Sequence, residues 1–166
     1  MRLGRLLIQI PLLTGCAIFL LAPPVLAADE VIVSSPIAIV VNKDAPVQNL
    51  SLAELRSIFL ADKQFWPNRT RITLLVRAPH SDERDFVLNR IYEMSEDQFR
   101  QYWIAKMFRA EVPRGPKIVF SSNMTLDLVV AIPGSISFIR ADAVSDDVRT
   151  VTVDGLRPSD AGYLLK

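Results

Sequence analysis

The sequence predicts an α/β fold in which a mixed or largely parallel sheet is flanked by helices. Continuous apolar runs rich in β-branched residues, such as PIAIVVN (36–42), are typical of strands buried on both faces. Segments with apolar residues three and four positions apart lie between such runs, and several begin at a serine suited to cap a helix. Because the two kinds of segment alternate along the chain, layers of helices around one sheet are expected.

Residues 1–27 have the pattern of a secretory signal peptide. The basic segment MRLGR precedes the apolar run LLIQIPLLTGCAIFLLA, and Val25 and Ala27 occupy the −3 and −1 positions of a cut after Ala27. A membrane anchor is the alternative, but the run falls short of about 20 residues and contains polar and proline interruptions. LTGC (13–16) resembles the bacterial lipobox, which leaves a lipid anchor at Cys16 as a further alternative.

Residues 28–166 are then expected to form one domain, periplasmic or secreted in a bacterium, with no membrane span. Loss of Arg2 and Arg5 lowers the 19 lysines and arginines to 17, against 18 acids. This balance argues against a nucleic-acid partner, which requires a basic face. Cys16 is the only cysteine, so the processed domain would contain no disulfide.

The helices have recognisable starts. Ser51 with Glu54, and Ser95 with Gln98, form the spacing of a capping box. Pro113, Gly115 and Pro116 then interrupt the helical pattern. The expected order is strand 36–42, helix 51–62, strand 71–77, helix 81–94, helix 95–108, strand 117–120, helix 121–132, strand 133–139 and strand 148–155.

No catalytic constellation is recognisable in the sequence. His80 is the only histidine, and no cluster with the ligand spacing of a metal site occurs. Nucleotide-binding glycine loops and nucleophile elbows are missing as well, so no cofactor is implied. Phe99, Trp103 and Met107 stand at i, i+4 and i+8, which favours a core stripe over a ligand box. We therefore expect that the protein is not an enzyme.

An anion-binding loop is the strongest candidate site. In α/β folds, ligands bind where strands end and helices begin, because free backbone N–H groups there attract negative charge. Arg77 ends a predicted strand, Ser81 caps the next helix, and Arg84 lies in its first turn. Two guanidinium groups and a hydroxyl could thus converge on an oxyanion. Asp82 and Glu83 offer the alternative that the helix satisfies its own N-terminus.

Three ordered motifs carry a resemblance to a known family. They are LSLAELRSIFLADKQFWPN, VRAPHSDERDFVL and YWIAKMF…P…SSNMTLDLVVAIPGSISFI. Together they resemble the periplasmic phosphate-binding proteins of ABC transporters, and more closely their small single-lobe relatives, over about residues 37–140. The resemblance implies one lobe of the type II periplasmic-binding-protein fold.

The resemblance also assigns site residues. It places Arg77 at the family's arginine and Ser81 at its serine, whereas Asp82 and Glu83 replace a glycine and a threonine. Ser122 and Asn123, in the next strand-to-helix turn, are weaker candidates, with an ordinary helix cap as the alternative. Ala61 and Ser137 also replace family glycines, which suggests altered loops around the site.

The resulting functional prediction is a solute-binding-like protein that recognises a small oxyanion such as phosphate in connection with an ABC transporter. A carboxylate beside a bound anion would repel it, and the chain lacks the part that builds the family's second lobe. The alternative is a non-catalytic interaction or sensory module that reuses the lobe without a solute, with a transporter or sensor component as its partner.

Overall fold

The computed structural model describes residues 35–166. The predicted signal peptide and Cys16 lie outside this range. Within the described part of the chain, no helix has both the length and the apolar character needed to cross a membrane.

The predicted α/β class is confirmed. The strands are β1 (Ile37–Val41), β2 (Asn49–Leu50), β3 (Thr73–Arg77), β4 (Lys117–Val119), β5 (Ser135–Arg140) and β6 (Arg149–Val153). The helices are α1 (Leu52–Phe59), α2 (Asp82–Val87), the π-helix η1 (Leu88–Tyr92), α3 (Glu96–Phe108), α4 (Ser122–Ala131) and the short 3-10 helix η2 (Ala141–Ala143).

The sheet is mixed, with the order β2-β6-β1-β5-β3-β4. Central strand β1 pairs antiparallel with both β5 and β6, so that Ile39 lies opposite Phe138 on one side and Val151 on the other. The pairs β3–β4, β3–β5 and β2–β6 are parallel. Strand β4 therefore forms one edge of the sheet, and its carboxyl end lies beside that of β3.

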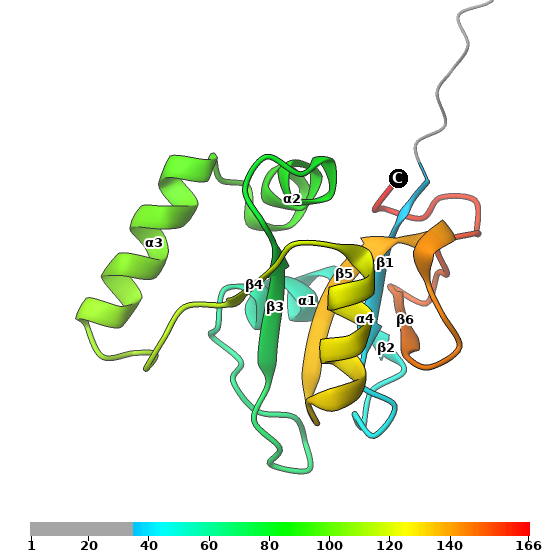
Figure 1. Cartoon of the computed structure of the whole chain (residues 1–166), viewed down its shortest axis with the longest axis horizontal. Coiled ribbons are helices and arrows are strands. Elements are labelled where there is room, and N and C mark those ends of the chain that lie inside the picture. Colours follow the sequence, from blue (N-terminus) through cyan, green and yellow to red (C-terminus); the bar gives the residue numbers. More distant parts are fainter. Residues whose placement is uncertain (1–34) are drawn as a thin grey trace, which may run out of the picture. The chain divides into compact units, whose positions relative to one another are not determined.

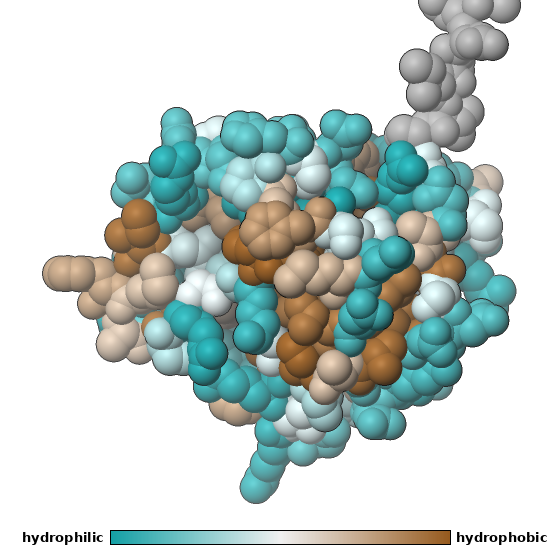
Figure 2. Space-filling view, viewed as in Figure 1, coloured by the Kyte–Doolittle hydropathy of each residue, from teal (hydrophilic) through white to brown (hydrophobic). Residues whose placement is uncertain are grey.

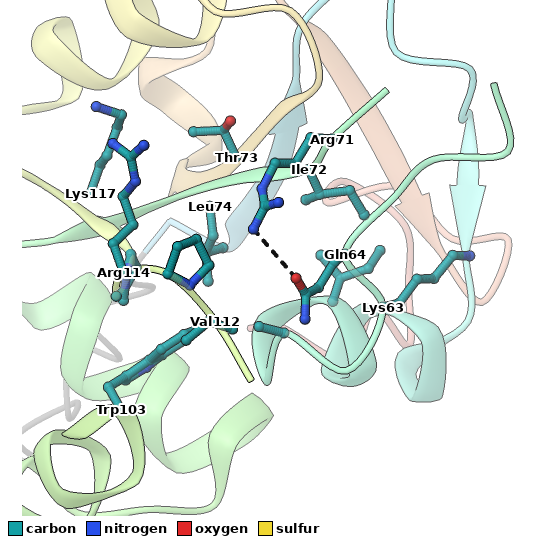
Figure 3. Close-up of a pocket in the computed structure, with 15 residues that line it drawn as sticks. Lys63, Gln64, Arg71, Ile72, Thr73, Leu74, Trp103, Val112, Arg114 and Lys117 are labelled. Atoms are coloured by element: carbon teal, nitrogen blue, oxygen red, sulfur yellow. Dashed lines mark hydrogen bonds between the residues drawn. The ribbon is translucent and has the colours of Figure 1, made fainter. Parts of the chain in front are cut away.

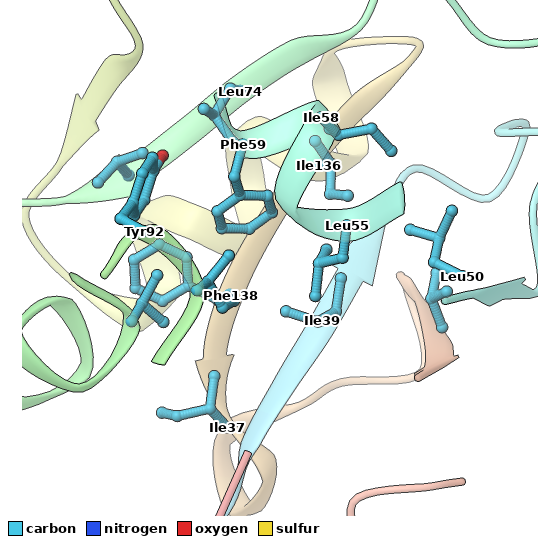
Figure 4. Close-up of a cluster of buried hydrophobic side chains, with 14 of the residues drawn as sticks. Ile37, Ile39, Leu50, Leu55, Ile58, Phe59, Leu74, Tyr92, Ile136 and Phe138 are labelled. Carbon is cyan, nitrogen blue, oxygen red and sulfur yellow. The ribbon is translucent and has the colours of Figure 1, made fainter. Parts of the chain in front are cut away.

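Helices cover both faces of the sheet (Figure 1). Alternate residues of β3 divide between two cores: Leu74 and Val76 join the larger cluster, whereas Leu75 joins the smaller one with Val129 of α4. The larger cluster is filled by α1, η1 and the start of α3, and Figure 4 shows Phe59, Tyr92 and Phe138 at its centre. Two-sided burial explains why the strands read as continuous apolar runs rather than alternating ones.

The predicted helix starts are confirmed. Ser51 with Glu54, and Ser95 with Gln98, form both halves of a capping box. The side chain of Ser121 accepts the backbone N–H of Met124 at the start of α4. Local hydrogen-bonding groups, which sequence spacing reports directly, thus set these boundaries.

Three expectations differ from the structure. The single helix 81–94 is instead α2 followed by the π-helix η1, which ends at Glu93 in a left-handed conformation (φ 54°). Strand β2 occupies residues that were expected to be loop. Met107 is 41% exposed, whereas Phe99 and Trp103 are buried as predicted, because the stripe leaves the core before the last turn of α3.

A tight turn before β5 depends on Gly134. Its φ is +75°, and a Cβ added there would lie 2.6 Å from the backbone oxygen of Arg71. Its carbonyl accepts the indole N–H of the buried Trp66 at 3.0 Å. Gly155 also has a positive φ of +80°, but nothing lies within 4 Å of its added Cβ.

We expect Gly134→Ala to destabilise the fold far more than Gly155→Ala. Both changes place a side chain in the left-handed region, at a cost of about 1–2 kcal/mol. Only Gly134→Ala also forces a clash with backbone, which adds about 1–3 kcal/mol. Urea unfolding followed by circular dichroism measures both free energies, and equal losses would contradict the close contact.

Candidate anion-binding site

The candidate site lies where β3 and β4 end. Arg77, the last residue of β3, is paired with Val119 of β4, and the backbone N–H of Ala78 donates to the carbonyl of Val119 at 2.8 Å. Helix α2 begins soon after the first strand and α4 soon after the second (Figure 1). The structure thus brings the residues of the two predicted turns to one edge of the molecule.

Ser81 caps α2. Its Oγ accepts the backbone N–H of Arg84 at 3.4 Å and donates to the carbonyl of Ala78 at 3.0 Å. The hydroxyl proton is therefore engaged within the loop. His80, just before it, has a φ of 65°, a left-handed turn that lets the chain reverse from strand to helix.

Arg84 is only 3% exposed, and each of its three guanidinium nitrogens donates to an acceptor within the protein. Nε and Nη2 donate to the two carboxylate oxygens of Glu96 at 2.7 and 2.8 Å, while Nη1 donates to the backbone carbonyl of Arg77 at 2.7 Å. The same group lies 4.7 Å from the ring centroid of Phe99. Glu96 supplies the counter-charge that permits a buried cation here. Sequence reasoning missed this role, because Glu96 stands in the next helix and served there only as a first-turn acid.

Arg77 is in a different situation. It is 9% exposed, and its buried Nε and Nη1 atoms have no hydrogen-bond partner among the described residues. The nearest carboxylate is that of Glu83, with 3.8 Å between Oε2 and Nε. This distance allows attraction but exceeds hydrogen-bond length. Arg77 thus retains donor capacity that neither the loop nor the helix uses.

The two acids of the loop differ in exposure. Asp82 is exposed at the first position of α2, where a carboxylate favours the helix N-terminus. The side chain of Glu83 is largely buried against Arg77. Of the two acids, Glu83 is therefore the one whose negative charge acts directly on the guanidinium of Arg77.

Ser122 and Asn123 lie in the first turn of α4, after the capping Ser121. Ser122 is partly buried and Asn123 exposed, and within residues 35–166 neither side chain makes a hydrogen bond to the protein. They stand close in sequence to Val119, the register partner of Arg77. Their backbone thus belongs to the same edge as the Arg77 loop.

Ala61 and Ser137, where the resemblance implied glycines, have different environments. Ala61 adopts a φ of 55°, a conformation that glycine reaches without strain. Ser137 is fully buried in β5, and its Oγ donates to the carbonyl of Leu75 at 2.9 Å. Ala61 thus has a glycine-like backbone, and Ser137 makes a side-chain hydrogen bond to the neighbouring strand.

Comparison with solved structures places the fold. The chain is similar to an ABC-type phosphate transport receptor from Vibrio cholerae, with 20% identity, a TM-score of 0.62, and coverage of 75% of this chain and 48% of that chain. It is similar to a putative phosphate ABC transporter substrate-binding protein with bound phosphate from Clostridium perfringens, with 21% identity, a TM-score of 0.59 and coverage of 75% and 47%. It is also similar to PstS from Borrelia burgdorferi, with 14% identity, a TM-score of 0.63, and coverage of 79% of this chain and 54% of that chain.

No family model matches the sequence, and no curated protein matches it. The chain spans about half the length of the solved structures that it resembles. The described domain therefore has the fold of these solved structures, the type II periplasmic-binding-protein fold, over about half of their length.

Proposed function

We propose that the protein is a periplasmic, non-enzymatic solute-binding-like protein that recognises a small oxyanion such as phosphate at the Arg77 loop, in connection with an ABC transporter. The observation that carries this proposal is the buried guanidinium of Arg77, whose Nε and Nη1 have no hydrogen-bond partner in the described chain. A buried unpaired donor is costly unless a ligand or water completes it, and arginine matches an oxyanion with parallel N–H groups.

Arg84 has a supporting role in this proposal. Each of its three guanidinium nitrogens already donates to a protein acceptor, and the group is buried against Phe99, so it is poorly placed to contact a ligand. By holding the carbonyl of Arg77, it fixes the point from which the Arg77 side chain leaves the strand. We therefore assign Arg84 as a positioning residue, and Arg77 as the residue that contacts the anion.

Glu83 competes with the anion for Arg77. A carboxylate 3.8 Å from Nε neutralises part of the guanidinium charge, and it would repel an oxyanion bound on the same group. The protein would consequently bind phosphate more weakly than an otherwise equal site without Glu83. The backbone N–H groups at the start of α4, a ten-residue helix that opens at the same edge, offset part of this repulsion.

The alternative function is an interaction or sensory module that binds no solute. It is favoured by apolar side chains exposed around edge strand β4: Ile118, Phe120 and Met124, of which Phe120 is 73% exposed. Figure 2 shows hydrophobic residues gathered on the face that α4 covers. An exposed apolar patch beside a sheet edge is typical of protein contacts.

Isothermal titration calorimetry with phosphate and sulfate tests the main proposal. We expect binding by the wild type and a loss of about 10- to 100-fold in Arg77→Gln, because charge-assisted hydrogen bonds contribute about 1.5–3 kcal/mol. Arg90→Gln, which removes an exposed arginine from η1, is the matched control and should bind as the wild type does. An Arg77→Gln variant that binds equally well would contradict the proposal.

A second titration tests the competitor. Glu83→Gln should bind phosphate about tenfold or more tightly than the wild type, since removing one negative charge near the anion is worth about 1.4 kcal/mol or more. Asp85→Asn changes the same charge on an exposed residue of α2 and should have a small effect. If neither the wild type nor Glu83→Gln shows binding heat, the oxyanion proposal is contradicted and the alternative of a module that binds no solute is favoured.

The supporting role of Arg84 has its own test in stability. Glu96→Gln should lower the free energy of unfolding by about 1–3 kcal/mol, because it leaves the buried guanidinium without its counter-charge. Asp97→Asn, next in sequence, breaks only an exposed pair with Arg100 and should stay within about 0.5 kcal/mol of the wild type. Equal free energies for the two variants, measured by urea unfolding, would show that the Arg84–Glu96 pair does not hold the loop.

A further inference from the structure

A cavity with a basic lining, called here the basic cavity, lies at the opposite end of β3 from Arg77 (Figure 3). Its volume is about 340 Å³, at the lower end of the range for small-molecule sites. It is open to solvent on one side and is lined by the end of α1 and the chain that follows it, the first residues of β3, Trp103 of α3, and residues 112–117. Thr73 lines it, and Arg77 stands four residues further along the strand, about 13 Å away at 3.3 Å per residue. The cavity is thus separate from the candidate anion loop.

The lining of this cavity is basic and contains no acidic residue. Its charged members are Lys63, Arg71, Arg114 and Lys117. Lys63 is paired with Glu54 at 3.3 Å, whereas the other three have no carboxylate within 4.0 Å in the part of the chain that the structure describes. Figure 3 shows Arg114 and Lys117 on one side of the opening, and Arg71 with Gln64 on the other. A cluster of positive charges around a concave surface raises the positive electrostatic potential there, which attracts anions.

The acids near the cavity are engaged elsewhere. Asp62 binds the buried Lys106 at 2.6 Å, and Glu111 pairs with Arg109 and with Lys106. Gln64 accepts from Nη2 of Arg71 at 3.4 Å and donates to the carbonyl of Glu111 at 3.1 Å. These contacts keep the neighbouring carboxylates occupied and hold the Arg71 guanidinium beside the opening.

The walls of the cavity are apolar and partly flat. Trp103 and Val112 lie at its base in Figure 3, with Leu74 and Ile72 from the sheet side. Trp103, Val112 and Leu74 are all buried side chains, so the walls are fixed by the core. A bare inorganic ion would leave such walls in contact with water, whereas an organic ligand would cover them.

We propose that this cavity binds an organic anion with a flat apolar ring system. The ring system of the ligand lies against Trp103 and its neighbours. The anionic group of the ligand, such as a carboxylate, faces Arg114, Lys117 and Arg71 at the opening. The site is independent of the oxyanion loop, because the two lie at opposite ends of β3 and share no lining residue.

Calorimetry with 2-naphthoate, with neutral 2-naphthamide as its matched control, tests this proposal. We expect saturable binding of 2-naphthoate, with an affinity at least about tenfold weaker for 2-naphthamide because the cationic rim then has no partner. Arg114→Gln/Lys117→Gln should weaken 2-naphthoate binding by about tenfold. The double variant Lys43→Gln/Arg90→Gln, which removes two exposed cations that do not line the cavity, should leave binding unchanged.

Amide chemical shifts separate this site from the Arg77 loop. With 2-naphthoate, the amides of Gly115 and Lys117 should move, and those of Ala78 and Ser81 should stay. Inorganic phosphate should move the latter pair, so the two proposals can fail independently. Equal affinities for 2-naphthoate and 2-naphthamide, unchanged binding in Arg114→Gln/Lys117→Gln, or no shift at Gly115 at millimolar ligand would each overturn the cavity proposal.

Discussion

The buried guanidinium of Arg84 is the interaction on which the arrangement of the functional surfaces depends. It joins the end of β3, through the carbonyl of Arg77, to α3, through Glu96 and Phe99. Helix α3 also carries Trp103, which lines the basic cavity, so the same helix contributes to both candidate sites. A charge buried this deeply is stable only when its partners surround it completely, so these contacts act as a unit. Of the two loop arginines, Arg77 is the one whose buried Nε and Nη1 have no hydrogen-bond partner among the described residues.

Much of the fold could be predicted from the sequence, because its signals are local. The capping boxes at Ser51 and Ser95 fix helix starts through hydrogen bonds between residues three positions apart. Strand β1 could be recognised because burial on both faces selects an uninterrupted β-branched run. The order of the motifs indicated the fold of phosphate-binding proteins even though identity to the solved structures is only 14–21%. Local hydrogen bonding and burial thus carry most of the architecture.

The rest depends on contacts between distant elements, which spacing does not report. The π-helix η1 interrupts a helix whose apolar periodicity continues through it. Arg77 and Arg84 look alike in sequence, yet Glu96 engages one and leaves the other to Glu83 at a longer distance. The basic cavity unites residues from four separate segments, so no single motif contains it. In each case the partner that decides a residue's role lies in another element.

The position of β1 in the sheet has a consequence for how the chain reaches its native state. Ile37 pairs with Arg140, and Ile39 pairs with Val151. The partners of the central strand therefore lie about a hundred residues further along the chain. Folding is slow in general when the chain must lose the entropy of closing long loops before the stabilising contacts between strands form. The middle of the sheet cannot assemble until the last strands have been synthesised. Until then, the apolar runs of β1 and β5 remain exposed to other chains.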